Sequence, residues 1–308
     1  MKIVFMGTPD FSVPCLKALI SEGHEVAAVF TQPDKPKGRG YKMIPPPVKV
    51  CALENGIAVY QPVSLRKGED AQSALDTLRS ISPELIIVVA YGQILPKEVL
   101  ELPKHGCINI HASLLPEYRG AAPIQRCILD GKTKTGVTSM LMEEGLDTGD
   151  MLIAREIEIG CDETASELHD RLSELGAKVL ADTVKAVENG TLEPQKQDDS
   201  RSTYAKMITK DLSRLDFSDT AQKVHNTIRG VTGFTQLFGK RFKIYRSHIE
   251  ENVSGEPGTV SDEKKFTVVC GDGNGVTFLE VQAEGGKRMA VSDYLRGKKL
   301  ERGQKLGE

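Results

Sequence analysis

Short apolar runs alternate with amphipathic helical patterns through the first 190 residues, and this alternation limits the possible folds more than any other feature. The runs are rich in Val and Ile and carry few polar residues, as strands do when both faces of a parallel sheet are covered. Strands that are separated by helices favour parallel pairing, because each crossover returns the chain to the same end of the sheet. The alternation therefore predicts an α/β fold with a mostly parallel sheet.

Two regions of different character are predicted along the chain. The strands expected in the first region are 2–6, 25–31, 57–60, 84–91, 106–111, 135–142 and 151–158, and its helices 10–21, 67–80, 96–101, 121–130 and 164–188. Beyond a short helix near 218–229, strand patterns with Gly-rich turns predict a small barrel, with strands at 241–247, 258–261, 265–270, 275–283 and 287–290. Residues 190–206 are polar and show no periodicity. We therefore expect two domains, 1–189 and 207–308, joined by a linker at 190–206.

Composition excludes several classes of protein. The longest apolar runs, such as 85–90, are much shorter than the roughly 20 residues that cross a bilayer. The N-terminus enters a strand pattern at once, without the apolar segment of a signal peptide, so we expect a cytoplasmic protein without membrane contact. The six cysteines are scattered and no His cluster accompanies them. Reduced thiols packed as small apolar side chains are thus favoured over disulfides, and no metal is expected.

The formal net charge of −3 conceals an asymmetry along the chain. Residues from Tyr204 onward carry a net charge of +4, whereas the residues before it carry −7. A basic module joined to an acidic one suits a polyanionic partner. So small a surplus does not by itself decide whether that partner is a nucleic acid.

The apolar run 106–111 contains two polar side chains that can take part in chemistry. Asn109 and His111 stand two positions apart, so in a strand they lie on one face, roughly 6.5–7 Å apart. Asp147 lies on a Gly-rich loop after the next apolar run. An amide, an imidazole and a carboxylate together can stabilise an oxyanion and move a proton. A buried, hydrogen-bonded pair without a catalytic role remains the alternative for Asn109 and His111.

Two other loops resemble ligand-binding segments. The turn 7–11 follows the first strand and opens a helix, but it has one glycine where a dinucleotide fingerprint has three, so no nicotinamide or flavin cofactor is expected. Residues 34–47 are too rich in Gly and Pro for regular structure. They form either a solvated basic loop or an arm that orders on phosphate. The cations of this segment are Lys35, Lys37, Arg39 and Lys42.

Four ordered blocks of the sequence resemble the folate-dependent formyltransferases. The likeness is carried by Asn-x-His at 109–111, Ser-Leu-Leu-Pro-x-Tyr-Arg-Gly at 113–120 and Leu-Asp-Thr-Gly-Asp at 146–150. The opening segment 2–11 and the long C-terminal extension narrow it to the branch that formylates initiator methionyl-tRNA. The resemblance implies a Rossmann-like catalytic domain followed by an OB-like β-barrel that binds tRNA.

The resemblance also implies a reaction and its residues. The formyl group of 10-formyltetrahydrofolate would pass to the α-amine of methionine on the initiator tRNA, with no metal. Asn109, His111 and Asp147 match the catalytic residues of such enzymes. The folate site is implied at Ser113, Leu114, Leu115, Pro116, Tyr91 and Gly92, and tRNA binding at Lys35, Lys37, Arg39 and Lys42. We expect a monomer.

Three alternatives to this function remain open at the level of sequence. One is a related folate formyltransferase that acts on a purine precursor or an amino sugar, and another is a hydrolase that deformylates the folate. The third is an RNA-binding module with an inert α/β half. The basic C-terminal module favours an RNA substrate over the first two, and the intact Asn109, His111 and Asp147 disfavour the third.

Overall fold

The computed structural model describes residues 1–37 and 41–307 and divides the chain into two compact units. The first unit comprises Met1–Gly120, Gly136–Ile157 and His169–Tyr204, and the second Ala121–Thr135, Glu158–Leu168 and Ala205–Glu308. Residues 190–204 thus make their contacts within the first unit. The division into domains 1–189 and 207–308 with a linker at 190–206 stays a prediction, because compactness alone does not test how the parts fold.

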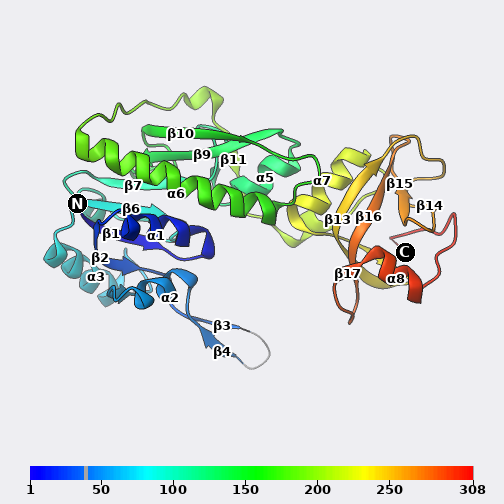
Figure 1. Ribbon diagram of the computed structural model, residues 1–308, viewed down its shortest axis with the longest axis horizontal. Helices are drawn as coiled ribbons and strands as arrows, with labels where there is room; N and C mark the ends of the chain where they lie inside the picture. The colour runs from blue at the N-terminus through cyan, green and yellow to red at the C-terminus, as the bar shows by residue number, and fades with distance from the viewer. Residues whose placement is uncertain (38–40, 308) are drawn as a thin grey trace. The chain divides into compact units, whose positions relative to one another are not determined.

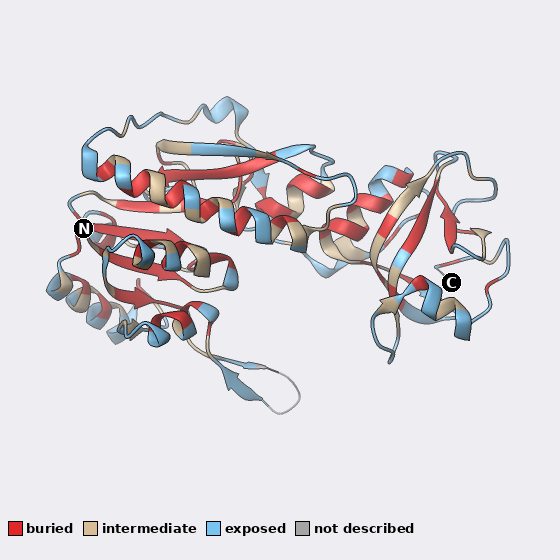
Figure 2. Ribbon diagram, in the orientation of Figure 1, coloured by how far each residue is buried: buried red, intermediate tan, exposed pale blue. Residues whose placement is uncertain are grey.

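The first unit is built on a seven-stranded sheet of order β10-β9-β7-β6-β1-β2-β5 (Figure 1). Its strands are β1 (Lys2–Gly7), β2 (Glu25–Phe30), β5 (Val59–Tyr60), β6 (Leu85–Val89), β7 (Cys107–His111), β9 (Lys134–Leu141) and β10 (Met151–Glu158). The strands from β7 to β5 pair in parallel, whereas β9 runs antiparallel to β7. The prediction of an α/β fold with a mostly parallel sheet is confirmed. Strand β6 is buried at every position (Figure 2), as its uninterrupted apolar run indicates.

Helices cover both faces of this sheet. They are α1 (Val13–Ser21), α2 (Pro47–Glu54), α3 (Gly68–Ile81), α4 (Lys97–Leu100) and α6 (Ala165–Asn189). Val4 and Met6 of β1 belong to one apolar cluster with Leu78 of α3 and Val99 of α4. On the other face Gly176 of α6 lies against Ile110, where an added Cβ would stand 3.3 Å from the Ile110 Cγ2 atom. No helix within residues 1–37 and 41–307 is long and apolar enough to cross a membrane.

Residues 34–47 contain regular structure, so the prediction of an irregular loop is wrong. Strands β3 (Lys35–Lys37) and β4 (Lys42–Ile44) pair antiparallel as a hairpin, and α2 begins at Pro47. A proline is tolerated in a two-stranded ribbon because each strand has one unpaired side. Pro47 occupies the first turn of a helix, where its fixed φ is favourable and no N–H is needed. Proline density was therefore a poor sign of irregular structure here.

The second unit contains an antiparallel six-stranded sheet of order β12-β13-β16-β15-β14, with β17 paired to β16. The strands are β12 (Gly233–Leu237), β13 (Lys240–Glu250), β14 (Val260–Asp262), β15 (Thr267–Val269), β16 (Gly275–Ala283) and β17 (Met289–Ala290). Its helices are α5 (Pro123–Leu129), α7 (Ala221–Val231) and α8 (Val291–Gly297). The prediction of a small β-rich module built from short strands is confirmed, and its strands pair antiparallel. Strand β12 was not predicted, because it follows α7 without a loop that would mark its start. Thr232 alone, with φ +59°, turns the chain between the two elements.

The last residues of the chain close this sheet into a barrel. The N–H of Leu306 donates to the Gly258 carbonyl, beside β14, at 2.8 Å. The N–H of Gly307 donates to the Gln236 carbonyl of β12 at 2.9 Å. Residues 303–307 thus fill the gap between the two edge strands that the strand order leaves open. Closure removes the unpaired backbone groups of an open edge.

The chain also contains several short elements outside the two main sheets. They are the paired strands β8 (Arg119–Gly120) and β11 (Tyr204–Ala205) and the 3₁₀ turns Asp10–Ser12, Asp199–Arg201 and Lys210–Ser213.

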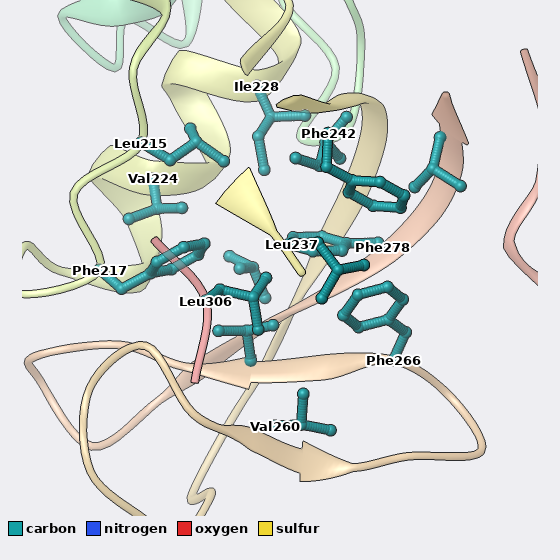
Figure 3. Packing of buried hydrophobic residues seen from close by; sticks show 14 of the residues in the cluster. Leu215, Phe217, Val224, Ile228, Leu237, Phe242, Val260, Phe266, Phe278 and Leu306 are labelled. Atoms are coloured by element: carbon teal, nitrogen blue, oxygen red, sulfur yellow. The ribbon is translucent and has the colours of Figure 1, made fainter. Parts of the chain in front are cut away.

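The barrel interior is filled by aromatic and branched side chains (Figure 3). Phe266 and Phe278 are both buried, with ring centroids 4.9 Å apart.

Replacing Phe278 with Ala should destabilise the second unit by about 3–5 kcal/mol, because the large cavity cannot collapse fully. Phe238, which is 60% exposed, provides the matched control. Phe238→Ala should change stability by less than about 0.5 kcal/mol. Urea unfolding of the full-length proteins measures both effects, and equal losses for the two variants would contradict the packing described.

Candidate active site

Asn109 and His111 lie on one face of β7. Cys107, two residues before Asn109, belongs to the apolar cluster on the α3 and α4 side of the sheet. Period-two alternation therefore assigns Asn109 and His111 to that same side. His111 is 7% exposed and Asn109 is partly buried. Within the residues that the structure describes, the Asn109 amide makes no side-chain hydrogen bond, so it is available to a ligand.

The ring of His111 is held on one edge. Its Nε2 atom lies 2.9 Å from the carbonyl oxygen of Tyr118. A carbonyl can only accept, so Nε2 carries a proton in this arrangement. The Nδ1 atom lies 3.7 Å from Oδ2 of Asp147, which is longer than a direct hydrogen bond. The Nδ1 edge thus remains for proton exchange with a substrate atom or with Asp147.

Asp147 reaches His111 only because the loop 142–150 returns along β7. The register pairs Leu141, the last residue of β9, with Ile108 near the start of β7, whereas His111 is its last residue. Asp147 adopts a left-handed conformation with φ +53°, which costs an ordinary residue roughly 1–2 kcal/mol. Its Oδ2 atom accepts a hydrogen bond from the N–H of Gly120 at 2.7 Å. Backbone and side chain together therefore aim this carboxylate at the imidazole.

Glycine is required in the same turn. A Cβ on Gly149 would lie 1.8 Å from the carbonyl oxygen of Leu141. No side chain fits in that space, so the loop can pass close to the end of β9 only at a glycine. The Gly-rich character noticed in the sequence therefore has a steric cause.

Gln197 contacts this turn and was missed by the sequence reasoning. Its Nε2 atom donates to the carbonyls of Asp147, at 2.8 Å, and Gly149, at 2.7 Å. Its Oε1 atom accepts from Nε of Arg119 at 3.0 Å. Gln197 lies in the polar segment 190–206, whose composition contains no signal for such contacts. Only a three-dimensional arrangement could reveal them.

The segment 113–116 is rigidly packed. Ser113 Oγ donates to the Glu117 carbonyl at 2.6 Å, and the Ser113 carbonyl accepts from Thr138 Oγ1 at 2.7 Å. Ser113, Leu115 and Pro116 are buried, Leu114 is partly exposed, and the Leu115–Pro116 bond is cis. Backbone groups and Leu114 are thus what this segment can offer a ligand. The predicted folate contacts at these four positions stay predictions.

Tyr91 lies in a different environment from the one expected of a ligand-binding side chain. It is 1% exposed and belongs to the core cluster with Leu65 and Leu78. Burial raises the pKa of its phenol. Its carbonyl oxygen accepts from Thr8 Oγ1 at 2.8 Å. A folate contact at this position would therefore use the backbone of Tyr91 or the exposed Gly92 that follows it.

The basic hairpin carries part of the predicted tRNA-binding set. Lys35 and Lys42 are exposed, and the pairing of Lys35 with Ile44 and of Lys37 with Lys42 assigns Lys35 and Lys42 to one face. Arg39 and the side chain of Lys37 lie outside the described residues.

A partly buried ion pair fixes the base of this hairpin. Lys49 Nζ donates to Asp34 Oδ1 at 2.8 Å and to Gln61 Oε1 at 2.7 Å. Hydrogen bonds from Lys49 and Gln61 lower the pKa of the Asp34 carboxyl.

The chemistry nearby does not include a reactive thiol. Burial raises the pKa of Cys107 to about 12, so this thiol stays protonated at neutral pH. In the described parts of the chain, no group of three or more His, Cys, Asp or Glu side chains is placed to hold a metal ion.

An α/β unit with a mostly parallel sheet is followed by an antiparallel β module, and both parts match the formyl transferases, a class of group-transfer enzymes. The family described as formyl transferase matches residues 1–184, and its C-terminal domain matches residues 207–299. The chain belongs to this family, and its full-length relatives assign it to the methionyl-tRNA formyltransferases.

Those relatives include the methionyl-tRNA formyltransferase of Alkaliphilus oremlandii, 51% identical over 314 residues with 100% of both chains covered. The enzyme of the same name from Clostridium novyi is 52% identical over 308 residues, with 98% of both chains covered. Among solved structures, the N-formyltransferase from Helicobacter canadensis, in complex with folinic acid and dTDP-3-aminofucose, matches with a TM-score of 0.69. That match has 19% identity and covers 92% of this chain and 99% of the other, so it supports the fold alone.

Replacing Asp34 with Asn tests the ion pair at the base of the hairpin. Because the folded-state pKa of Asp34 is depressed, its stabilisation is present above the unfolded pKa of about 3.9 and is lost as pH falls through the folded value. The thermal midpoint of Asp34→Asn should therefore lie below that of the wild type at pH 7, and the difference should shrink below about pH 4. Asp76→Asn, at an exposed carboxylate paired with Arg79, is the control and should change little. A difference that is the same at all pH values would contradict this account.

Proposed function

We propose that this chain transfers the formyl group of 10-formyltetrahydrofolate to the α-amine of methionine esterified to the initiator tRNA, by direct attack of the amine. The observation that carries the proposal is the His111 and Asp147 pair beside the unengaged amide of Asn109. Identity of 51% over the full length to a methionyl-tRNA formyltransferase supports the acceptor. The donor follows from the folate dependence of the family.

The acceptor amine can act as its own nucleophile. A free α-amine has a pKa near 7.7–8.0, and the adjacent ester should lower it, so much of the amine is unprotonated at neutral pH. No covalent enzyme intermediate is needed. In agreement, the Ser113 hydroxyl donates to the Glu117 carbonyl rather than to a base, so it is not set up as a nucleophile.

Attack on the formyl carbon places negative charge on the formyl oxygen. The Asn109 amide can donate a hydrogen bond to that oxygen. On His111 Nδ1 can donate only while the ring is protonated, because Nε2 already donates to the Tyr118 carbonyl. One such donor typically lowers the barrier by about 2.7–4 kcal/mol. Stabilisation of the oxyanion is therefore the largest single contribution that these side chains can make.

Asp147 would assist the movement of the proton. The 3.7 Å between its Oδ2 atom and His111 Nδ1 is only slightly longer than a hydrogen bond, so a small movement would allow direct proton exchange between them. The carboxylate stabilises the imidazole while it is protonated. The pair can then carry the proton of the attacking amine to the folate nitrogen that leaves.

The two substrates would approach from different segments. The backbone of 113–116, with Leu114, Tyr91 and Gly92, would line the folate site, and Lys35, Lys37, Arg39 and Lys42 would contact tRNA phosphates. The basic segment from Tyr204 onward, with its net charge of +4, would add further phosphate contacts.

One assay separates the proposed function from its alternatives. The protein is incubated with radiolabelled formyl donor and either charged initiator or charged elongator tRNA. Label on the initiator tRNA supports the proposal. Release of free formate, or binding of tRNA without turnover, would instead identify a hydrolase or a passive RNA-binding protein.

Substituting Asn109 or His111 with Ala, or Asp147 with Asn, should lower the single-turnover rate by about 10²–10³-fold, because each change removes a group that acts on the reacting atoms. The matched control is Asp150→Asn, three residues along the same loop, which should retain the rate. Circular dichroism verifies that each variant folds. A near-normal rate in any of the three would exclude its assigned role.

Removing two cations from the hairpin, with Lys35→Ala and Lys42→Ala together, should raise the KM for tRNA. The slope of the logarithm of the binding constant against the logarithm of the salt concentration should become shallower by about one for each lost phosphate contact. Folate affinity should hardly change. The control pair Lys178→Ala and Lys185→Ala removes equal charge from exposed positions of α6. If both pairs alter tRNA use equally, the hairpin acts only through net charge and the proposed contacts are wrong.

A further inference from the structure

We propose that Gln197 is a positioning residue that holds the carboxylate of Asp147 in place beside His111; the inference rests on the proposed function of those two side chains. A single carboxamide supplies two N–H donors and one acceptor, and in Gln197 all are used. The two donors bind the carbonyls of Asp147 and Gly149, and the acceptor binds Arg119.

These three contacts join the two segments that control the catalytic pair. On one side is the turn 147–149, which carries the carboxylate itself. On the other side is Arg119, between Tyr118, whose carbonyl binds His111, and Gly120, whose N–H binds Asp147. Gln197 therefore connects the backbone that orients the imidazole to the backbone that orients the carboxylate.

The turn needs such a restraint. Asp147 is held at φ +53°, a conformation that a non-glycine residue leaves readily unless its surroundings impose it. The loop also returns along β7 without a strand partner over this stretch. Hydrogen bonds to the carbonyls on both sides of Thr148 oppose the relaxation of the turn.

Backbone hydrogen bonds on both sides of Gln197 fix the segment that carries it. Gln195 pairs with Met151 in an isolated antiparallel bridge, with backbone bonds of 2.8 Å in both directions. Further along, the Thr203 hydroxyl accepts from the N–H of Tyr118 at 2.8 Å, and the Thr203 carbonyl accepts from the N–H of Arg119 at 2.9 Å. Gln197 thus lies between two attachments of its own segment to the site.

The test compares full-length variants. Gln197→Met keeps the length of the side chain and removes all three hydrogen bonds. Its kcat should fall about 10–100-fold, because small displacements of a catalytic pair have effects of this size. The KM for charged tRNA should stay within about twofold, since no contact to tRNA is lost. Gln195→Met, with an exposed side chain on the same segment, should leave both constants unchanged.

A double substitution shows whether Gln197 acts through Asp147. When Gln197→Met is added to Asp147→Asn, kcat should fall no more than about threefold further, because the carboxylate that Gln197 positions is already absent. A purely structural role would reduce kcat by the same factor in both backgrounds and would overturn the inference.

The outcomes distinguish this inference from the proposed function. Normal kcat in Gln197→Met, with low kcat in Asp147→Asn, overturns the role of Gln197 alone. Normal kcat in Asp147→Asn overturns the proposed function of the pair. If Gln197→Met does not fold, Gln197→Glu replaces it, because it keeps the acceptor for Arg119 and loses both donors. Its kcat should fall similarly, and an unchanged kcat would overturn the inference.

Discussion

The hydrogen bond between His111 Nε2 and the Tyr118 carbonyl determines which edge of the imidazole is left for chemistry. Because the carbonyl accepts only, one ring proton is committed to the protein and Nδ1 faces Asp147. The segment that supplies this carbonyl also supplies the N–H of Gly120 that binds the carboxylate. The geometry of the pair is thus set by a few adjacent peptide groups, and the rest of the first unit serves to keep those groups in place.

Much of this arrangement follows from the sequence, and the part that does not has a physical reason. The buried strands were evident because Val and Ile runs such as 85–89 have few alternative structures. Asn109 and His111 could be assigned to one face because a strand has a fixed period of two. Gln197 could not be found in this way, since a polar residue in an aperiodic segment gives no sign of its partners. The basic hairpin was missed because proline was interpreted only as a breaker.

The restraint on Asp147 illustrates how a loop can be rigid without regular structure. Glycine at position 149 permits a close approach that no other residue could make, and the left-handed φ of Asp147 turns its side chain toward the imidazole. Both features carry a conformational cost. They persist because backbone N–H and carbonyl groups on neighbouring segments are satisfied in the same arrangement. Rigidity here arises from hydrogen-bond saturation rather than from apolar packing.

The segment that closes the barrel has a consequence for the order of folding. Leu306 and Gly307 supply the hydrogen bonds that join the two open edges of the C-terminal sheet. Gln236 and Gly307 lie far apart in the sequence, so their hydrogen bond closes a long loop of chain. The barrel therefore cannot close before the strands between these two residues have formed, and we expect closure to be a late step of folding. A chain that lost residues 303–307 to proteolysis would keep every strand of the barrel and yet expose two sheet edges with unpaired backbone N–H and carbonyl groups.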